Sequence, residues 1–250
     1  MKKLLVLKNI EREGPGLFLK IAKGKGYLPE IYNLSLGDKL PEPKKEDLIL
    51  IMGGPMSVKD INNQNYFWLR EETKFIKRAI ENQIAIIGVC LGAQLLAHIF
   101  GGKVEKLKDK FNKGNKPELG WSDISSIDKK SNDEISRSLI EPLKVLHWHG
   151  DRIILPTQAK LLASSARCKE QLFKVGEFIY GLQFHVETEG SMTDIWIRND
   201  KRFITYGLGE NGQKILKVQC KEFELSSHNA RSLFINKLIN KINEYKKTSM

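Results

Sequence analysis

Cysteine is scarce in this sequence of 250 residues, and no long apolar run occurs in it. The three cysteines, Cys90, Cys168 and Cys220, are an odd number without the spacing of a zinc motif. They therefore predict neither a disulfide framework nor a cysteine-based metal site. The N-terminal segment also lacks the apolar core and the small-residue cleavage site of a secretory signal. Together, these absences predict a cytoplasmic protein that does not span a membrane.

A basic motif interleaved with aromatic residues is also missing, although the formal net charge is +11. The lysines are spread along the chain rather than gathered in one segment. This distribution favours a solvated basic surface over a site for nucleic acid. Specific nucleic-acid binding is therefore the weakest of the functions that we consider.

Apolar strands alternate with amphipathic helices in the first half of the sequence. The patterns predict strands at 3–9, 28–34, 47–55 and 84–89, and helices at 16–26 and 65–83. The second half has shorter strand patterns, at 118–127, 143–149, 160–166 and a hairpin over 171–187 that turns at Gly176 and Glu177. Residues 226–247 have the spacing of a helix. This order predicts an α/β fold with an open, mixed and mostly parallel sheet flanked by helices.

The sequence contains no internal repeat and no low-complexity linker. The simplest division is a domain over residues 1–190, followed by a helical C-terminal extension over residues 191–250 that packs on the same domain.

Cys90 lies in the pattern G-x-C-x-G, between an apolar strand and a helix. A nucleophile elbow has this arrangement, because the tight turn leaves no room for side chains at Gly88 and Gly92. The N-terminus of the helix that begins near Leu91 is expected to lower the pKa of the thiol. The alternative is a buried cysteine that acts as a small apolar residue.

His185 and Glu187 stand two residues apart on an expected strand, so their side chains share a face. A thiolate nucleophile needs an imidazole that moves protons, and the imidazole needs a carboxylate that orients it. The alternative is that His185 and Glu187 lie on the solvent-facing side of a strand, without a catalytic role. The apolar residues on both sides of the pair favour a buried position instead.

Gly53 and Gly54 follow another apolar strand and precede Pro55. Acyl transfer needs two N–H donors for the developing oxyanion. Leu91, directly after the cysteine, is expected to supply one donor and Gly54 the other, although a plain loop would have the same glycines.

His147 and His149 are the residues that most resemble metal ligands. No third ligand stands near them at a familiar spacing, so we expect no metal here. Cys168 and Cys220 lack a glycine elbow and are interpreted as structural.

An ordered set of segments resembles the class I, triad-type glutamine amidotransferases, in particular stand-alone proteins similar to the amidotransferase domain of GMP synthase. The segments are GGPMSV, GVCLGAQLLA, ELGW, LHWHGDRIILP, LLASSARCKEQLFKVG and GLQFHVE, which cover residues 47–187 almost continuously. The resemblance implies the fold of that family, which is flavodoxin-like.

The resemblance also implies roles for individual residues. Cys90 is the expected nucleophile, His185 the general base and acid, and Glu187 the orienting carboxylate. Gly54 and Leu91 would form the oxyanion hole. Gln94, Gly53 and Trp121 are expected to border the substrate, with core packing as the alternative for Trp121.

The implied reaction is hydrolysis of the side-chain amide of L-glutamine through a γ-glutamyl thioester, without a metal or an organic cofactor. The ammonia would serve an acceptor or a separate synthetase, because the sequence has no ATP-pyrophosphatase loop of the S-G-G-x-D-S kind. One departure is Val186, where the family usually has proline. A γ-glutamyl peptidase or hydrolase would use the same triad, and a non-catalytic module on this fold would use none of it.

Overall fold

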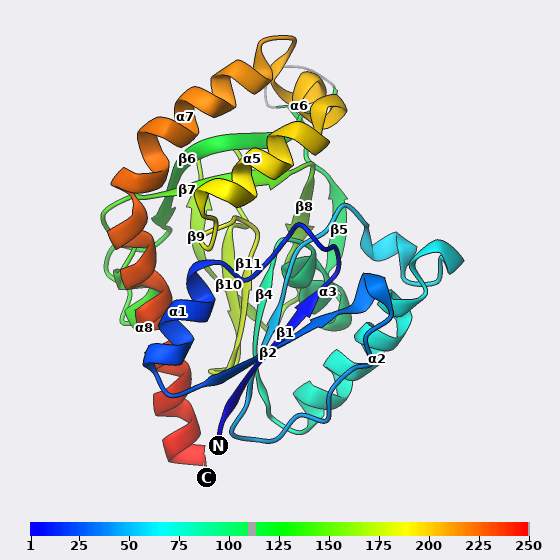
Figure 1. The fold of residues 1–250 in the computed structure, drawn as a ribbon. Helices are drawn as coiled ribbons and strands as arrows, with labels where there is room; N and C mark the ends of the chain where they lie inside the picture. The colour runs from blue at the N-terminus through cyan, green and yellow to red at the C-terminus, as the bar shows by residue number, and fades with distance from the viewer. Residues whose placement is uncertain (110–113, 250) are drawn as a thin grey trace.

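A mixed sheet of nine strands runs through the middle of the computed structural model, which describes residues 1–109 and 114–249 (Figure 1). Its strands are β1 (Lys3–Lys8), β2 (Leu28–Asn33), β3 (Leu48–Ile51), β4 (Ala85–Val89), β6 (Glu118–Ser126), β7 (Leu143–His149), β9 (Ala159–Ser165), β10 (Leu172–Val175) and β11 (Ile179–Leu182). A separate antiparallel pair consists of β5 (Lys103–Lys106) and β8 (Asp151–Ile154). The α-helices are α1 (Leu17–Gly24), α2 (Trp68–Glu81), α3 (Leu91–Ile99), α4 (Glu134–Arg137), α5 (Gly190–Asn199), α6 (Lys201–Leu208), α7 (Gly212–Ser226) and α8 (His228–Ser249). Short 3-10 helices cover Leu34–Leu36, Val58–Asp60 and Gln64–Tyr66.

The strand order of the large sheet is β2-β1-β3-β4-β11-β10-β9-β6-β7. The pairs from β2 to β11 are parallel, and the pairs from β11 to β7 are antiparallel. β4 lies between β3 and β11, as its apolar sequence predicts for a strand that is covered on both faces. The predicted mixed sheet flanked by helices is confirmed.

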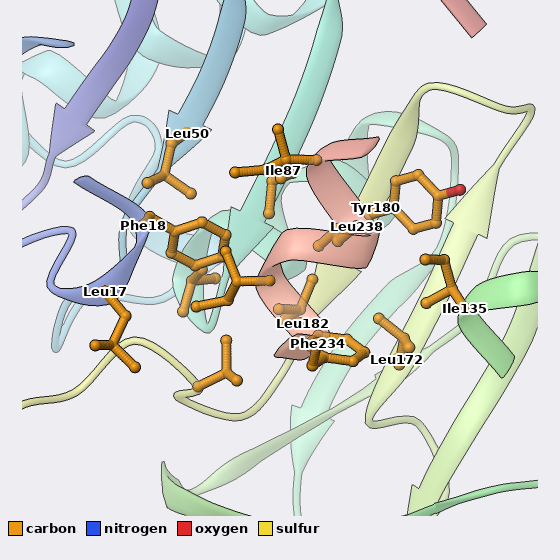
Figure 2. Close-up of a cluster of buried hydrophobic side chains, with 14 of the residues drawn as sticks. Leu17, Phe18, Leu50, Ile87, Ile135, Leu172, Tyr180, Leu182, Phe234 and Leu238 are labelled. Carbon is orange, nitrogen blue, oxygen red and sulfur yellow. The ribbon is translucent and has the colours of Figure 1, made fainter. Parts of the chain in front are cut away.

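Helices cover both faces of the sheet because the parallel strands are apolar on both sides. In β3, Leu48 and Leu50 belong to one buried cluster, while Ile49 and Ile51 belong to another. The first cluster packs under α1, α4 and α8, and the second packs under α2 and α3. Figure 2 shows the first cluster, in which Phe18 of α1 and Leu238 of α8 lie among side chains of the strands.

The predicted helical C-terminal extension is confirmed, and it is part of the core. α5, α6 and α7 pack over β6 and β7 around a cluster that includes Trp121, Trp148 and Trp196. α8 runs beside α1 (Figure 1) and buries Phe234, Ile235, Leu238, Ile239 and Ile242 against the main sheet. The helix predicted at 226–247 is α8. The sequence patterns did not predict α5, α6 and α7 as three distinct helices.

The expected strand that carries His185 and Glu187 ends earlier than predicted. β11 follows β4 only as far as the pair Leu182–Val89. The chain beyond it leaves the ladder, and His185 forms an isolated bridge with Leu146 of β7. The pair β5–β8 was also not predicted, because Lys103–Lys106 is mostly exposed and charged. Among the described residues, no helix combines the length and the apolar composition that crossing a bilayer requires.

Candidate active site

The carboxyl ends of four adjacent parallel strands bring the predicted site residues together. β4 ends directly before Cys90, β3 before the Gly53–Gly54 turn, and β11 shortly before His185. The fourth strand is β1, and the loop that follows it contains Glu13. Ligands of open α/β sheets bind at this edge, because the parallel strands all end there.

Cys90 occupies a strained turn between β4 and α3. Its backbone has φ 51° and ψ −105°, although it is not a glycine. Its N–H donates to the carbonyl of Leu182 at 2.7 Å. A Cβ on Gly88 would lie 2.5 Å from the carbonyl carbon of Gly92, and a Cβ on Gly92 would lie 2.4 Å from the carbonyl oxygen of Ile51. The glycines of the elbow therefore allow β3, β4 and α3 to approach closely, as the sequence predicts.

His185 and Glu187 form the buried hydrogen-bonded pair that the sequence suggests. The Nδ1 atom of His185 lies 2.7 Å from Oε1 of Glu187, and both residues are at most 1% exposed. The backbone of His185 is held by Leu146, whose carbonyl accepts its N–H at 2.8 Å. Trp196 of α5 presents its ring to the imidazole at a centroid distance of 4.8 Å. Contacts from several elements thus fix the orientation of one ring.

The pKa of Cys90 is shifted in the direction opposite to the one that the sequence predicts. Burial raises the pKa of the Cys90 thiol, and the neighbouring His185 opposes this effect only in part. The sequence predicted that the helix N-terminus would lower the pKa of Cys90. The predicted direction of the shift is therefore wrong for the protein without substrate. Burial would lower the pKa of His185, but Glu187 and Cys90 outweigh it and raise the pKa well above its ordinary value. The arrangement therefore places a strong base beside a thiol that needs one.

Backbone contacts from both ends of the chain hold the turn that contains Glu187. Arg231 of α8 is fully buried, and its Nη1 donates to the carbonyls of Val186 at 3.1 Å and Thr188 at 2.7 Å. The N–H of Leu17, at the start of α1, donates to the carbonyl of Glu187 at 3.0 Å. Sequence reasoning missed both contacts.

One of the two expected oxyanion residues, Gly54, borders a cavity of about 270 Å³. Gly54 lines it together with Cys90, and Leu91 is the first residue of α3. Gly53 lies at the back of the site, since a Cβ there would be 3.2 Å from the Cβ of Cys90 and 3.4 Å from Cε1 of His185. The glycine turn is therefore next to Cys90.

Gln94 lines the same cavity, and a second glutamine connects it to the thiol. The Nε2 atom of Gln94 donates to Oε1 of Gln183 at 3.2 Å, and Nε2 of Gln183 lies 3.7 Å from the sulfur of Cys90. Gln183 lies within the segment GLQFHVE, so its place in that segment was the available signal.

Trp121 lies outside the cavity. It is 4% exposed, and its ring packs in the cluster under α5, α6 and α7, with the guanidinium of Arg231 5.0 Å from the ring centre. Its Nε1 donates to the sulfur of Cys220 at 3.4 Å. Trp121 is therefore a packed residue in the structure, and its expected place beside the substrate stays a prediction.

Glu13 is a further group in the site, and no sequence pattern indicated it. It lines the cavity, and its Oε2 has no hydrogen-bond partner although the residue is only 6% exposed. A Cβ on Gly53 would lie 2.3 Å from that oxygen, so the carboxyl group lies beside Gly53, which also borders Cys90 and His185. Burial raises the pKa of Glu13 to about 7.

Two ion pairs also line the cavity. Arg12 contacts Asp200 of the C-terminal region at 2.8 Å, and Lys106 contacts Asp151 at 3.0 Å. These four residues come from separate segments, so only the folded chain brings them together.

Comparison with known proteins was consistent with this geometry. Residues 28–202 match the family model described as glutamine amidotransferase class-I. A putative glutamine amidotransferase-like protein, YfeJ of Salmonella typhimurium, is 32% identical over 70% of this chain and 71% of its own. A glutamine-hydrolysing GMP synthase subunit of Sulfolobus acidocaldarius is 33% identical over 61% of this chain and 73% of its own.

A solved structure supports the same assignment. The crystal structure of a glutamine amidotransferase from Thermotoga maritima has a TM-score of 0.79 and 25% identity, and the match covers 96% of this chain and 97% of that one. Together with the family match over residues 28–202, this likeness shows that the chain belongs to the class-I glutamine amidotransferase family.

Proposed function

We propose that this protein hydrolyses the side-chain amide of L-glutamine, with Cys90 as nucleophile, His185 as proton carrier and Glu187 as its orienting carboxylate. The observation that carries the proposal is the strained Cys90 turn beside a buried imidazole whose Nδ1 lies 2.7 Å from Glu187. A cysteine nucleophile requires this combination of a turn that presents the thiol to a cavity, a base and a group that orients the base.

The proposed reaction has two stages. In the first, the Cys90 thiol gives its proton to His185 as the sulfur attacks the γ-carboxamide carbon. The C–N bond then breaks, His185 protonates the departing nitrogen, and ammonia and a γ-glutamyl thioester form. In the second stage, His185 takes a proton from water, the resulting hydroxide attacks the thioester, and glutamate and the thiol are released.

The backbone N–H groups of Gly54 and Leu91 are the proposed donors to the oxyanion of both tetrahedral intermediates. Leu91 is the first residue of α3, where N–H groups have no partner within the helix. Gln94 and Gly53 are the proposed neighbours of the γ-glutamyl group, and Gln183 contacts both Gln94 and the sulfur of Cys90.

We also propose that a separate synthetase uses the ammonia. This part of the proposal is supported by relatives such as the GMP synthase subunit of Sulfolobus acidocaldarius. The triad and the two oxyanion donors supply every group that the amide hydrolysis needs, so the proposed half-reaction uses no cofactor.

A γ-glutamyl hydrolase is the second candidate, because the cavity extends beyond Cys90. It continues to Trp148, Asp151 and Phe203, which lie on β7, β8 and α6. A substituent on the amide nitrogen would have space there. The two candidates share every catalytic residue and differ in the leaving group.

Release of glutamate and ammonia from L-glutamine by the purified protein tests the proposal. A panel of γ-glutamyl amides and peptides, tested in parallel, separates the two candidates. Release should vanish in Cys90→Ala and persist in Cys220→Ala, which removes a half-buried thiol outside the cavity. Absence of turnover on every substrate, together with absence of Cys90 labelling by a glutamine-analogue electrophile, would favour a non-catalytic module.

A further inference from the structure

A buried cluster of two imidazoles and one carboxylate lies between β6 and β7, behind the active-site wall. Glu118 is the register partner of His149, and His147 is the partner of Gly120. Oε2 of Glu118 lies 3.3 Å from Nε2 of His149 and 3.7 Å from Nδ1 of His147. These three atoms all lie within 4.8 Å of one another, and no member of the cluster is more than 5% exposed. Strand pairing thus supplies the third ligand that the sequence spacing lacked.

Hydrogen bonds around the cluster determine which atoms carry lone pairs. Nδ1 of His149 lies 2.8 Å from the backbone carbonyl of Asp151, which can only accept, so Nδ1 carries the hydrogen. In the neutral ring, Nε2 therefore carries the lone pair, and it lies 3.3 Å from Oε2 of Glu118 and 3.4 Å from the amide nitrogen of Gln171. The amide of Gln171 donates to Oε2 of Glu118 at 2.8 Å. Metal-binding sites commonly have this outer arrangement, in which a carbonyl fixes the histidine tautomer and a donor orients the carboxylate.

His147 supplies an independent observation. Its side chain is fully buried, and neither ring nitrogen has a hydrogen-bond partner. A buried polar group without a partner needs an explanation, and a bound ion is one of the few that apply.

We propose that Glu118, His147 and His149 bind one divalent transition-metal ion, for which Zn²⁺ has the best-matched chemistry. Zinc takes imidazole nitrogen and carboxylate oxygen at about 2.0–2.2 Å, which places ligand atoms about 3.4 Å apart in a tetrahedron. The contact between His149 and Glu118 already has this length, and the contact between His147 and Glu118 must shorten by a few tenths of an ångström. The ligand nitrogens of the two histidines, which lie within 4.8 Å of each other, must also approach to about 3.4 Å.

The ion is structural in this proposal and takes no part in glutamine hydrolysis. The ion would link β6 to β7. In this part of β7, His149 lines the cavity and Leu146 forms the bridge with His185. Because His149 lines the cavity, the cavity also provides the path by which the ion enters.

Titration of the chelator-treated protein with Zn²⁺ and Co²⁺ tests the proposal. The experiment uses the Cys90→Ser background, so that the active-site thiol cannot bind the ion. We expect one equivalent to bind and Co²⁺ to give visible ligand-field bands. Glu118→Gln should abolish saturable binding, and Gln171→Ala should weaken it by about 10- to 100-fold. His98→Asn, on the exposed face of α3, is the matched control and should bind unchanged.

Thermal unfolding keeps the result interpretable when a variant is unstable. Zn²⁺ should raise the midpoint of the Cys90→Ser protein and leave that of the Glu118→Gln variant unchanged. If Glu118→Gln does not fold, the Co²⁺ spectrum of the parent decides, because nitrogen and oxygen ligands give ligand-field bands without a sulfur-to-metal charge-transfer band. No saturable binding by the parent, binding that survives Glu118→Gln, or a sulfur charge-transfer band would each overturn the proposal.

Discussion

Arg231 holds the backbone on both sides of Glu187, 44 residues earlier in the chain, through its two bonds to the carbonyls of Val186 and Thr188. The remaining donors of its guanidinium reach Ser227 at 3.0 Å and the carbonyl of Glu224 at 2.8 Å. The C-terminal extension therefore positions the carboxylate that orients His185, without contacting the cavity at that point.

Arg231→Lys should lower kcat for glutamine hydrolysis by about 10- to 100-fold, because a small displacement of an orienting group has an effect of that size. A lysine ammonium cannot reproduce the planar fork that bonds both carbonyls. KM should change by less than about threefold, since the variant leaves the cavity wall intact. Steady-state kinetics on L-glutamine provide the measurement, and Arg198→Lys, at an exposed position of α5, is the control. A lower thermal midpoint with an unchanged kcat would show that Arg231 acts only on stability.

Glu13→Gln should move the titration of Cys90 to lower pH. The Glu13 carboxylate helps to raise the pKa of the thiol, so removing its charge favours the thiolate. The rate of Cys90 alkylation as a function of pH reports this change, because the thiolate is the reactive form. Glu11→Gln, at an exposed position two residues earlier, should leave the profile unchanged. A profile that is identical in wild type and Glu13→Gln would mean that the two groups do not interact.

Ionisation of the buried Glu72 carboxyl should lower the free energy of unfolding as the pH rises. Burial raises its pKa to about 8 from the ordinary 4.5, although Asn9 donates to Oε1 at 3.2 Å. Between these values the folded state binds the proton that the unfolded state has lost, so the free energy of unfolding falls as the pH rises. The slope is up to about 1.4 kcal/mol per pH unit.

Glu72→Gln should remove this contribution, and its free energy of unfolding should fall less than that of the wild type between pH 5 and pH 8. Urea unfolding across this range gives the measurement. Glu71→Gln is the control, because Glu71 is the adjacent, exposed residue in the same helix. Equal slopes for Glu72→Gln and the wild type would show that the buried carboxyl does not titrate in this window.

Gly88→Ala should destabilise the fold by about 3 kcal/mol, in the range of strong overpacking. The new Cβ would lie 2.5–2.8 Å from the backbone of Gly92 and Ala93, so β4 and α3 would have to separate. Gly24→Ala is the control at the end of α1, where a Cβ meets no atom within 4 Å. The control should be neutral or up to about 1 kcal/mol more stable. Equal unfolding midpoints for the two variants would contradict close packing at the elbow.

Local patterns were enough to predict the alternation of strands and helices and the elbow at Cys90. Both depend on residues that are adjacent in sequence, such as Gly88 and Gly92 around the cysteine. The hairpin of β10 and β11 was predicted for the same reason. The end of β11 was not, because polar and apolar residues continue to alternate after Leu182, as in a strand, while the pairing with β4 stops at Val89.

The residues that the sequence did not reveal act across large separations. Glu13, Arg231 and Glu118 each meet their partners only after distant segments pack. Glu13 and Arg231 stand outside the matching segments, and Glu118 stands in ELGW, far in sequence from His147 and His149. The expected direction of the Cys90 pKa shift was wrong for a related reason: the helix N-terminus is visible in the sequence, whereas the burial that raises the pKa depends on the whole fold. Trp121 kept two alternatives because a tryptophan pattern does not distinguish a cavity wall from a core.

The three consecutive carbonyls of Val186, Glu187 and Thr188 receive their hydrogen bonds from α1 and α8, near opposite ends of the chain. During synthesis, Cys90, His185 and Glu187 leave the ribosome before Arg231 does, because synthesis runs from the N-terminus. A nascent chain at that stage has the complete set of reactive groups, but two of the three carbonyls still lack their donor. We therefore expect glutamine hydrolysis to begin only when α8 has docked, so that incomplete chains do not consume glutamine.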